Sequence, residues 1–391
     1  MRAIIILGLA MVTGCGGDDS STNATGGSGA AAGGGGQAAG GGSSGDAGSG
    51  ATGASGASSG GSSSGGSSSG GTSSGGSSSG GSSSGGAAST GLSAKYPGDV
   101  GMAQDPDVIW FEDFEQASVG AVVARYDDAK QSGLALDPDV PPGSSGKQSM
   151  KMTANGSGPN AVDLYKRFTT GYDEWFVRYY AKYQGGVQWH HTGVWVGGYN
   201  PSTTYPSPNA GLKPNGDDRF SVSIEPITSG ANPRLDFYNY WMKMHSWMDN
   251  PSGSTAYYGN ALAHDGNFKV DDDAWMCVEI HVKINPSASS GAGAELGVWK
   301  NDQSVIQYDD QKPLGYWIKD KFCPDGATST SCTNYPPSPG TTKIPLDLQY
   351  RNTAALKLNY FWPQNYITSG GAGNVKYDHM IVAKSRVGCM Q

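Results

Sequence analysis

The sequence predicts an all-β fold, a two-sheet jelly-roll sandwich, preceded by a disordered linker rich in Gly and Ser. Stretches of alternating apolar and polar residues recur through the second part of the chain, and clusters of Gly, Pro, Asn and Ser separate them. No convincing amphipathic helix longer than two or three turns is evident. Because these stretches show no repeat of fixed period, a sandwich or jelly roll is favoured over a propeller.

The first residues, MRAIIILGLAMVTGC, have the layout of a secretory signal peptide. Arg2 precedes an apolar run that is too short to span a bilayer. The run ends in VTGC, which resembles the bacterial lipobox, and this resemblance implies that Cys15 is lipidated and becomes the mature N-terminus. Gly16 follows instead of Asp, which by the same resemblance implies an outer-membrane lipoprotein of the bacterial cell envelope, surface-exposed or periplasmic. The alternative is an ordinary signal peptide with an incidental cysteine.

Residues 16–93 consist almost entirely of Gly, Ser, Ala and Thr. Such a segment lacks the apolar side chains that would offset the entropy cost of ordering, so we expect it to be disordered. A Gly/Ser coil of this length has an r.m.s. span of roughly 50 Å. We therefore expect a tether that holds a folded jelly-roll domain, residues 94–391, away from a membrane surface.

The charge of the chain restricts its partners. The formal net charge is −8 at pH 7, which argues against binding to nucleic acid or to an anionic membrane surface. The expected contact with a membrane is therefore through the N-terminal lipid anchor only.

The cysteines predict disulfides. Four of the five cysteines follow the linker, and an even number in an exported domain suggests paired thiols. Cys323 and Cys332 flank a loop rich in Pro and Ser, and we expect them to pair. Cys277 then pairs with Cys389 by elimination, which would join a core strand to the C-terminus. A zinc site is less favoured because the chain has no Cys-x-x-Cys spacing.

The predicted strands each alternate in polarity, and several are rich in aromatic residues. In order along the chain they are WFVRYYAKY (175–183), RFSVSIE (219–225), RLDFYNYW (234–241), WMCVEIHVKIN (275–285), AELGVWK (294–300), ALKLNYFW (355–362) and VKYDHMIVA (375–383).

The two faces of these strands differ in chemistry, because residues two apart point the same way. Apolar residues share one face in each of the strands 219–225 and 275–285. The opposite faces are ordinary solvated surfaces in most single strands, but Tyr beside Arg and Lys favours a sugar-binding surface, where rings stack on sugars. The side chains on these faces are Arg178, Tyr180 and Lys182; Arg219, Ser221, Ser223 and Glu225; Asp236, Tyr238 and Tyr240; and Cys277, Glu279, His281 and Lys283.

Two adjacent histidines, His190 and His191, lie among aromatic residues and glycines in QWHHTGVWVGG. If 188–194 is a strand, the two side chains face opposite ways and one of them is structural or solvent-facing. Catalysis or substrate binding, a structural role, and metal binding remain alternatives. Metal binding is the least favoured, since no His-x-x-x-His spacing or clear third ligand accompanies the pair.

The order of motifs resembles the concanavalin A-like jelly-roll polysaccharide lyases of the alginate- and glucuronan-lyase type. WFEDFE (110–115) resembles their first strand, WFVRYYAKY their R-Y-Y-x-x-Y strand, and RFSVSIE with LDFYNYW a strand pair that ends in Tyr-x-Tyr. AWMCVEIHVKIN with ELGVWKND resembles a hairpin, and VKYDHMIVAKSRVG the closing strand. The resemblance covers most of residues 105–389.

The resemblance implies a lyase for an acidic, uronate-containing polysaccharide, with Tyr238 and Tyr240 on the paired tyrosines near the scissile bond. His190 or His191 falls near a position where some of these enzymes carry a catalytic Lys or His. One motif departs from the alginate lyases, because Ser221-x-Ser223 stands where they have Ser-x-Arg. A cationic role would then fall to Arg219 or Arg178, or be lost.

β-Elimination explains these residue types. The reaction removes the proton at C5 of a uronate and expels the substituent at O4, which requires a base, an acid and groups that neutralise the carboxylate. Tyr240 is the expected base or acid and His191 its partner, and nearby cations would have to lower the tyrosine pKa. The candidate catalytic residues are Tyr240, His191, His190 and Arg178. The candidate substrate-binding residues are Tyr238, Arg219, Gln188, Tyr180 and Lys243.

Two other functions stay open at this point. A non-catalytic carbohydrate-binding lipoprotein would use the same aromatic and cationic face. A glycoside hydrolase is disfavoured, because it needs two carboxylates at a set separation and no strand carries a matching Glu-x-x-x-Glu run.

No cofactor is expected to be required. A structural calcium ion could be bound by acidic residues near the first and last strands, although such residues more often form salt bridges.

Overall fold

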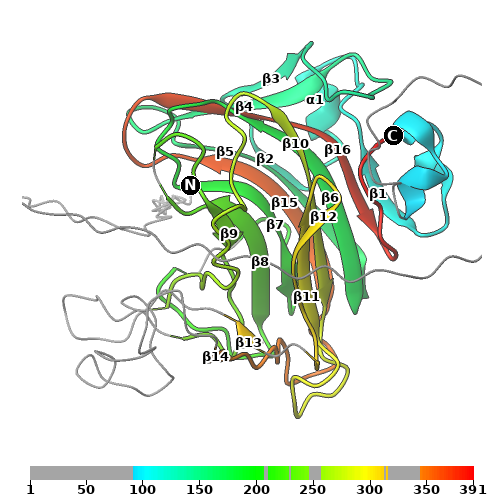
Figure 1. Ribbon diagram of the computed structural model, residues 1–391, viewed down its shortest axis with the longest axis vertical. Helices are drawn as coiled ribbons and strands as arrows, with labels where there is room; N and C mark the ends of the chain where they lie inside the picture. Colours follow the sequence, from blue (N-terminus) through cyan, green and yellow to red (C-terminus); the bar gives the residue numbers. More distant parts are fainter. Residues whose placement is uncertain (1–90, 207–209, 229, 246–256, 312–313, 316–343) are drawn as a thin grey trace, which may run out of the picture. The chain divides into compact units, whose positions relative to one another are not determined.

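The computed structural model describes residues 91–206, 210–228, 230–245, 257–311, 314–315 and 344–391. These residues form two large antiparallel sheets, as the sequence predicts, and Figure 1 shows them as two layers. Sheet A has the order β12 (Gln303–Tyr308), β11 (Glu295–Lys300), β10 (Trp275–Lys283), β6 (Glu174–Tyr183), β16 (Ala372–Ala383), β4 (Ser149–Asn155) and β3 (Leu134–Asp137), with β1 (Val108–Glu112) also paired to β16.

Sheet B is the second layer. Its order is β2 (Asp128–Lys130), β5 (Ala161–Tyr172), β15 (Leu358–Tyr366), β7 (His191–Tyr199), β8 (Arg219–Pro226) and β9 (Leu235–Phe237). A short pair, β13 (Leu314–Gly315) and β14 (Ile344–Pro345), lies outside both sheets. The helical elements are short: η1 (Leu92–Ala94), η2 (Pro97–Asp99), η3 (Met102–Gln104) and α1 (Val119–Val123). In the described residues no helix has the length and apolar character needed to cross a bilayer.

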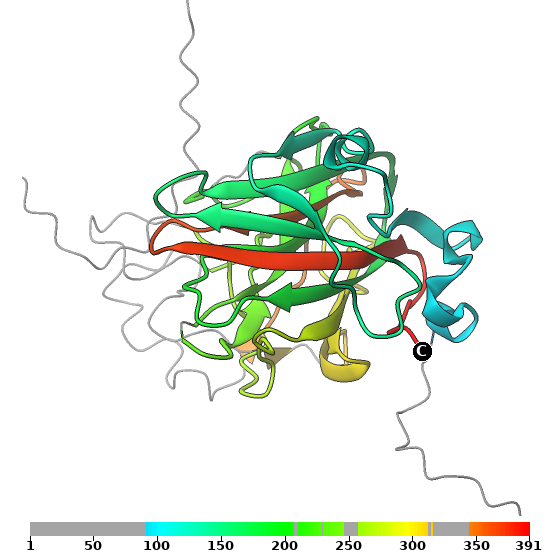
Figure 2. The same cartoon turned by 90° about the horizontal axis from the view of Figure 1, so that it is seen from above.

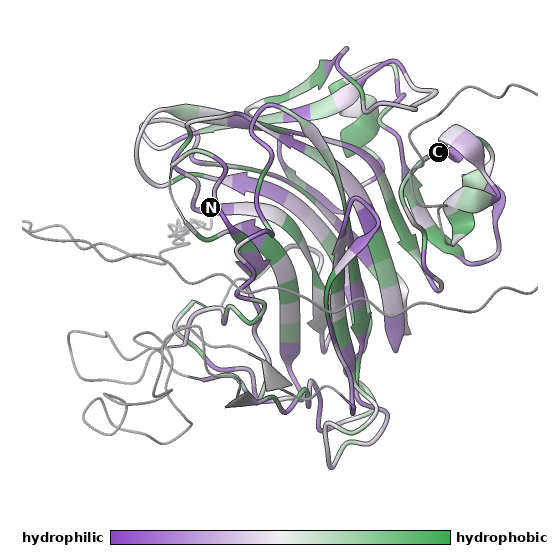
Figure 3. Ribbon diagram, in the orientation of Figure 1, coloured by the Kyte–Doolittle hydropathy of each residue, from purple (hydrophilic) through white to green (hydrophobic). Residues whose placement is uncertain are grey.

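The core lies between the two sheets and follows the alternation of the strands, which Figure 3 shows as bands of contrasting hydropathy. Thr192, Val194 and Val196 of β7 are buried on the face turned toward sheet A. Tyr183 of β6 donates its hydroxyl hydrogen to the Thr192 carbonyl oxygen at 3.2 Å, which links the layers. The apolar faces expected for 219–225 and 275–285 are buried in the same core: Phe220, Val222, Ile224, Met276, Val278, Ile280, Val282 and Ile284.

Part of the outward face of sheet A is covered by both ends of the domain. The segment η1–η3, in cyan, lies beside the C-terminus in Figures 1 and 2. Leu92 N donates to Arg386 O at 3.0 Å and Ser93 N to Val387 O at 2.8 Å, so the two ends pair directly. Leu92 and Ser93 are therefore buried in the domain, although the sequence assigned them to the tether.

The disulfide between Cys277 and Cys389 is confirmed, with a Cα–Cα distance of 6.0 Å. It joins β10 to the chain end, as the pairing by elimination predicted. The other expected pair, Cys323 with Cys332, lies outside the described residues, and so do Cys15 and the segment 16–90.

Several element boundaries differ from those expected. The strand predicted over 234–241 ends at Phe237, and after it Tyr240 pairs with Ser221 of β8 through an isolated bridge. The strand predicted at 355–362 is shifted to Leu358–Tyr366. Strands β2, β3, β4, β5 and β12 are not among the predicted strands, although β4 (SMKMTAN) alternates clearly between buried apolar and partly exposed polar residues.

Candidate functional site

The outward face of sheet B carries the residues with the chemistry expected from the sequence. On β7, His191 and Trp195 point away from the core, because Thr192, Val194 and Val196 occupy the buried face. Glu225 lies on the same face of β8, since Val194 pairs with Ile224 and Trp195 with Ser223. Tyr238 and Tyr240 follow β9 and pair with Ser223 and Ser221 through backbone hydrogen bonds.

Glu225 orients two side chains of β7. Its Oε2 lies 2.8 Å from His191 Nδ1, and its Oε1 accepts a hydrogen bond from Trp195 Nε1. Because a carboxylate accepts, His191 Nδ1 donates, and the lone pair is then on His191 Nε2. Gly193, between these two β7 residues, is required here, since a Cβ on it would lie 2.1 Å from the Ile224 carbonyl oxygen.

Tyr238 and Tyr240 form a pair beside this histidine. Their hydroxyl oxygens are 3.5 Å apart, and the Tyr238 ring centroid lies 4.7 Å from that of His191. Burial raises the pKa of both tyrosines above the ordinary value. Both hydroxyls are therefore protonated at neutral pH and act as hydrogen-bond donors. The expectation that neighbouring cations lower the pKa of Tyr240 is wrong, because desolvation is the dominant effect.

His190 lies against His191 and not on the opposite face. It precedes β7, outside the strand, so the expected alternation does not apply, and the two ring centroids are 4.0 Å apart. Burial and the neighbouring imidazole lower the pKa of His190 to about 3. In the described part of the chain its buried Nδ1 has no hydrogen-bond partner. A neutral imidazole with an unused buried nitrogen is suited to a polar ligand.

Aromatic rings support this cluster from neighbouring strands. Trp195 lies 5.5 Å from Trp362 and 5.6 Å from Tyr238 between ring centroids. Tyr366 of β15 is parallel to the His191 ring, with an interplanar angle of 3° and a centroid distance of 6.0 Å. These contacts hold His191 and Tyr238 in fixed orientations.

Arg178 and Tyr180 are on the other sheet, and their predicted roles beside the tyrosines are wrong. Both project from the outward face of β6 in sheet A. Arg178 is fully buried, and its Nη2 lies 2.5 Å from Asp99 Oδ2. The Tyr180 hydroxyl accepts a hydrogen bond from Met390 N at 2.7 Å, and burial raises its pKa to about 12. Neither side chain reaches the outward face of sheet B.

The remaining predicted substrate-binding residues surround the cluster less closely. Arg219 begins β8 on the Glu225 face, but its Nη1 lies 2.5 Å from Asp218 Oδ2 and its Nη2 donates to Leu212 O at 3.0 Å. Gln188 is exposed two residues before His190, and Lys243 is exposed after Tyr240. The structure thus brings together His190, His191, Tyr238 and Tyr240 among the predicted residues.

Glu225 is the member of this cluster that the sequence reasoning did not name as a candidate site residue. Its alternation placed it on the correct face, but its partners lie on β7, some thirty residues earlier in sequence, and no local motif connects them. The parallel stacking of Tyr366 on His191 was missed for the same reason, because it depends on β15 lying beside β7 in the sheet.

The carboxylates near Glu225 do not form a hydrolase pair. Asp236, opposite Glu225, accepts backbone hydrogen bonds from Phe237, Leu262, Ala263 and His264 and is thereby engaged. Asp163 is three strands away, about 14 Å at the usual strand spacing, which exceeds the 6.5–9.5 Å of an inverting pair. In the described residues of this face, glycoside hydrolysis therefore lacks its second carboxylate.

Acidic groups elsewhere give weak support for a metal. Glu174, His281 and Glu295 have ligand atoms within 4.8 Å of one another on sheet A. However, Lys283 Nζ lies 2.5 Å from Glu295 Oε1, so the ammonium group of Lys283 already neutralises a carboxylate of this cluster. Glu112, at the end of β1, bonds Arg125 at 2.7 Å, and burial raises its pKa to about 6, which does not suit a calcium ligand. A structural calcium ion stays a prediction.

No protein-family model and no curated protein matches this sequence. Among solved structures, the chain is similar to the PL-14 alginate lyase from Aplysia kurodai, with a TM-score of 0.45 and 13% identity over 71% of this chain and 99% of that one. It is also similar to alginate lyase vAL-1 from Chlorella virus (TM-score 0.42, 13% identity, 71% and 99% covered). A third is the endo-β-1,4-glucuronan lyase from the fungus Trichoderma reesei (TM-score 0.39, 12% identity, 71% and 95% covered).

Proposed function

We propose that this chain is a polysaccharide lyase that cleaves an acidic, uronate-containing glycan by β-elimination on the outward face of sheet B. The observation that supports this function best is the convergence of a carboxylate-bonded histidine and a protonated tyrosine pair. His191 is bonded to Glu225 at 2.8 Å, and Tyr238 and Tyr240 are adjacent to it. This arrangement offers a proton acceptor and a proton donor on one surface.

His191 is the proposed base. With Nδ1–H donated to Glu225, the Nε2 lone pair is available to take the C5 proton of a bound uronate. Tyr240 is the proposed acid, since burial raises its pKa and keeps the hydroxyl protonated. It would donate its proton to O4 as the C4–O4 bond breaks. The raised pKa favours the acid over the base among the two roles expected for this tyrosine.

Neutral donors would stabilise the substrate carboxylate. Arg178 is buried in sheet A, and Arg219 is engaged by Asp218. His190 and Tyr238 are the donors adjacent to the proposed base. Preorganised neutral hydrogen bonds can stabilise the enolate-like intermediate in a site with little water.

Lyase activity is tested by incubating the purified full-length chain with a panel of uronic-acid polymers and following the ultraviolet absorbance of the new C4–C5 double bond. We expect a rise with at least one polymer, and a loss of about 100- to 10,000-fold in Tyr240→Phe. Tyr96→Phe is a matched control, because it removes a tyrosine hydroxyl that is bonded to Asp105 in the N-terminal segment. A flat trace across the panel with polymer binding retained would instead identify a non-catalytic carbohydrate-binding protein.

We further propose that the chain is anchored to the bacterial outer membrane through a lipid on Cys15. The lipobox-like VTGC and the Gly/Ser segment after it support this location. Growth of expressing cells with a labelled fatty acid should label the wild type and not Cys15→Ser. Equal labelling of the two chains would exclude this anchor.

A further inference from the structure

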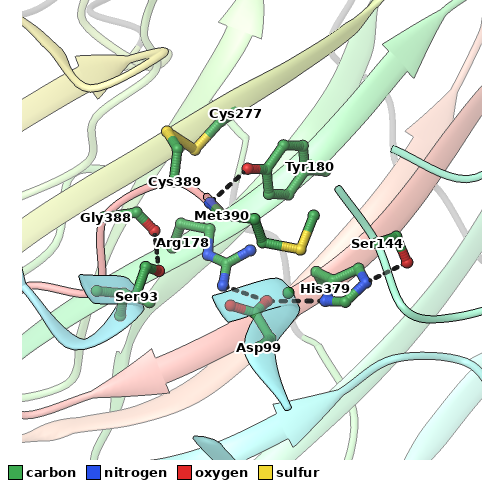
Figure 4. Close-up of polar contacts among 12 residues, drawn as sticks. Ser93, Asp99, Ser144, Arg178, Tyr180, Cys277, His379, Gly388, Cys389 and Met390 are labelled. Carbon is green, nitrogen blue, oxygen red and sulfur yellow. Dashed lines mark hydrogen bonds and ion pairs between the residues drawn. A yellow bond between two sulfur atoms is a disulfide. The ribbon is translucent and has the colours of Figure 1, made fainter. Parts of the chain in front are cut away.

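A second polar cluster lies on the outward face of sheet A, where the N-terminal segment covers β6 and β16. Figure 4 shows Ser144, His379 and Asp99 connected in a row. His379 Nε2 lies 2.7 Å from Ser144 Oγ, and His379 Nδ1 lies 2.8 Å from Asp99 Oδ2. The three residues come from the loop before β4, from β16 and from η2, so the fold brings together segments that are far apart in sequence.

The hydrogen bonds of this row fix which atom carries each proton. Burial alone would raise the pKa of Asp99, but the Arg178 guanidinium and the His379 hydrogen bond bring it below the ordinary value. Since the ionised carboxylate accepts, His379 Nδ1 donates to it. His379 Nε2 then has a lone pair, and Ser144 donates its hydroxyl hydrogen to that atom. A hydroxyl, an imidazole and a carboxylate in this order form the arrangement that activates serine as a nucleophile.

The backbone holds two of these residues in an unusual conformation. Asp99 has a φ of 62° and His379 a φ of 45°, in the left-handed region that non-glycine residues rarely adopt. The pairing of β16 with β6 shifts register between Asp378 and Ile381, so His379 lies in an irregular part of the strand. Strained residues and β-bulges concentrate at active sites, where they redirect a side chain.

A pocket with a volume of about 280 Å³ adjoins His379. Its lining includes Gly98, Gly101, Ala103 and Phe111, and on the Ser144 side it is formed by the next two residues, Ser145 and Gly146. Gly146 N donates to Ser144 Oγ at 2.9 Å, and the Ser144 hydroxyl hydrogen is directed to His379 Nε2, so both neighbours fix the position of Ser144 Oγ. Ser144 itself is partly exposed. Asp113 and Glu115 also line the pocket, which favours neutral over anionic substrates.

We propose that Ser144, His379 and Asp99 form a serine hydrolase site for esters of short, neutral carboxylic acids. Ser144 Oγ attacks the carbonyl carbon and forms the new C–O bond while His379 Nε2 takes the hydroxyl proton. The bond to the alcohol oxygen breaks, and the alcohol leaves with that proton. Water then attacks the acyl group on Ser144 and gives a proton to His379, and the proton returns to Ser144 as the acid departs. Asp99 is a positioning residue that orients the imidazole.

The same contacts also attach the N-terminal segment to sheet A, and a purely structural role has to be distinguished from hydrolysis. A structural hydrogen bond from Ser144 affects unfolding without making its oxygen nucleophilic. Reaction at Ser144 Oγ is therefore the decisive measurement.

The test uses the purified full-length chain, a fluorophosphonate probe with mass-spectrometric identification of the labelled residue, and hydrolysis of p-nitrophenyl acetate. We expect the phosphonate on Ser144 and saturable hydrolysis that falls at least about 100-fold in Ser144→Ala. Ser385→Ala is the matched control, because this partly exposed serine bonds a carboxylate, Asp107 Oδ2 at 2.8 Å. No label on Ser144, or equal hydrolysis by wild type and Ser144→Ala, would overturn the proposal.

Asp99→Asn tests the positioning role. The amide favours the wrong imidazole tautomer, so we expect kcat for p-nitrophenyl acetate to fall with KM kept, together with slower labelling of Ser144. Unchanged kcat in a folded variant would contradict the role of Asp99. If this variant does not fold, the labelling of Ser144 in the wild type still decides the proposal. Neither readout depends on glycan cleavage, so lyase activity and hydrolase activity can fail separately.

Discussion

The outward faces of the two sheets have similar sequence patterns but different surroundings. On sheet A, the N-terminal segment and the C-terminus cover Arg178 of β6 and Glu279 of β10, which are buried, while Lys182 and Lys283 of the same strands stay partly exposed. Glu279, for example, accepts backbone hydrogen bonds from Val387 at 2.6 Å and Gly388 at 3.0 Å. On sheet B, the corresponding face groups His190, His191 and the two tyrosines. Alternation identifies a polar face, but the segments that pack on it decide whether it binds a ligand or another part of the chain.

The largest effect is expected from His191→Ala on sheet B. Removing the proposed base should lower kcat/KM for glycan cleavage by about 100- to 10,000-fold, as for other general bases. The buried Glu225 carboxylate loses its His191 partner and keeps that of Trp195 Nε1, so the free energy of unfolding should also fall. Steady-state kinetics and urea unfolding measure the two quantities separately. Equal activity of the variant and the wild type would show that a residue other than His191 is the base.

Arg178→Ala tests the buried ion pair on sheet A. It leaves the Asp99 carboxylate buried without its guanidinium partner, and breaking such a pair costs roughly 3–5 kcal/mol. We expect the free energy of unfolding to fall by this amount while glycan cleavage by the folded fraction is unchanged. Urea unfolding and initial rates at low temperature measure these effects. If glycan cleavage falls and the free energy of unfolding does not, Arg178 has a role in the cleavage reaction after all.

Removal of the Cys277–Cys389 disulfide tests how much the attachment of the C-terminus to sheet A stabilises the fold. Cys277 and Cys389 are separated by 112 residues, and loss of a native disulfide costs about 2–5 kcal/mol. The double variant Cys277→Ser with Cys389→Ser should therefore show a lower Tm in calorimetry. Reductant should lower the Tm of the wild type more than that of the double variant, which keeps only the expected Cys323–Cys332 pair. If the double variant has the Tm of the wild type, the bond does not stabilise the fold.

The smallest effect is a pH dependence due to His190. Its pKa in the folded state is lowered to about 3 from the ordinary 6.5, so the folded state disfavours the protonated form. The corresponding stability is present above pH 6.5 and is lost as the pH falls toward 3, with a slope of at most about 1.4 kcal/mol per pH unit. Urea unfolding from pH 7 to pH 4 should show a weaker dependence in His190→Gln than in the wild type. Parallel curves would contradict the buried, neutral histidine.

Part of the site was predictable from the sequence and part was not. The Tyr238 and Tyr240 pair and the two histidines could be identified from alternation and from a family resemblance. The Glu225–His191 bond could not, because it depends on the antiparallel register of β7 and β8. Arg178 was assigned to the wrong face, because an alternating pattern does not state which sheet a strand joins.

The sequence by itself determined the β architecture, since alternation and turn residues act locally and specify strands. It also predicted the pairing of Cys277 with Cys389, by elimination once Cys323 was paired with Cys332, and the structure selected this pair among the three connectivities that four cysteines allow. Only the tertiary structure decided which polar faces are covered and which side chains meet. The Ser144–His379–Asp99 row shows the reason. Its members are separated by up to 280 residues, and only the packing of the N-terminal segment onto sheet A brings them into hydrogen-bond distance.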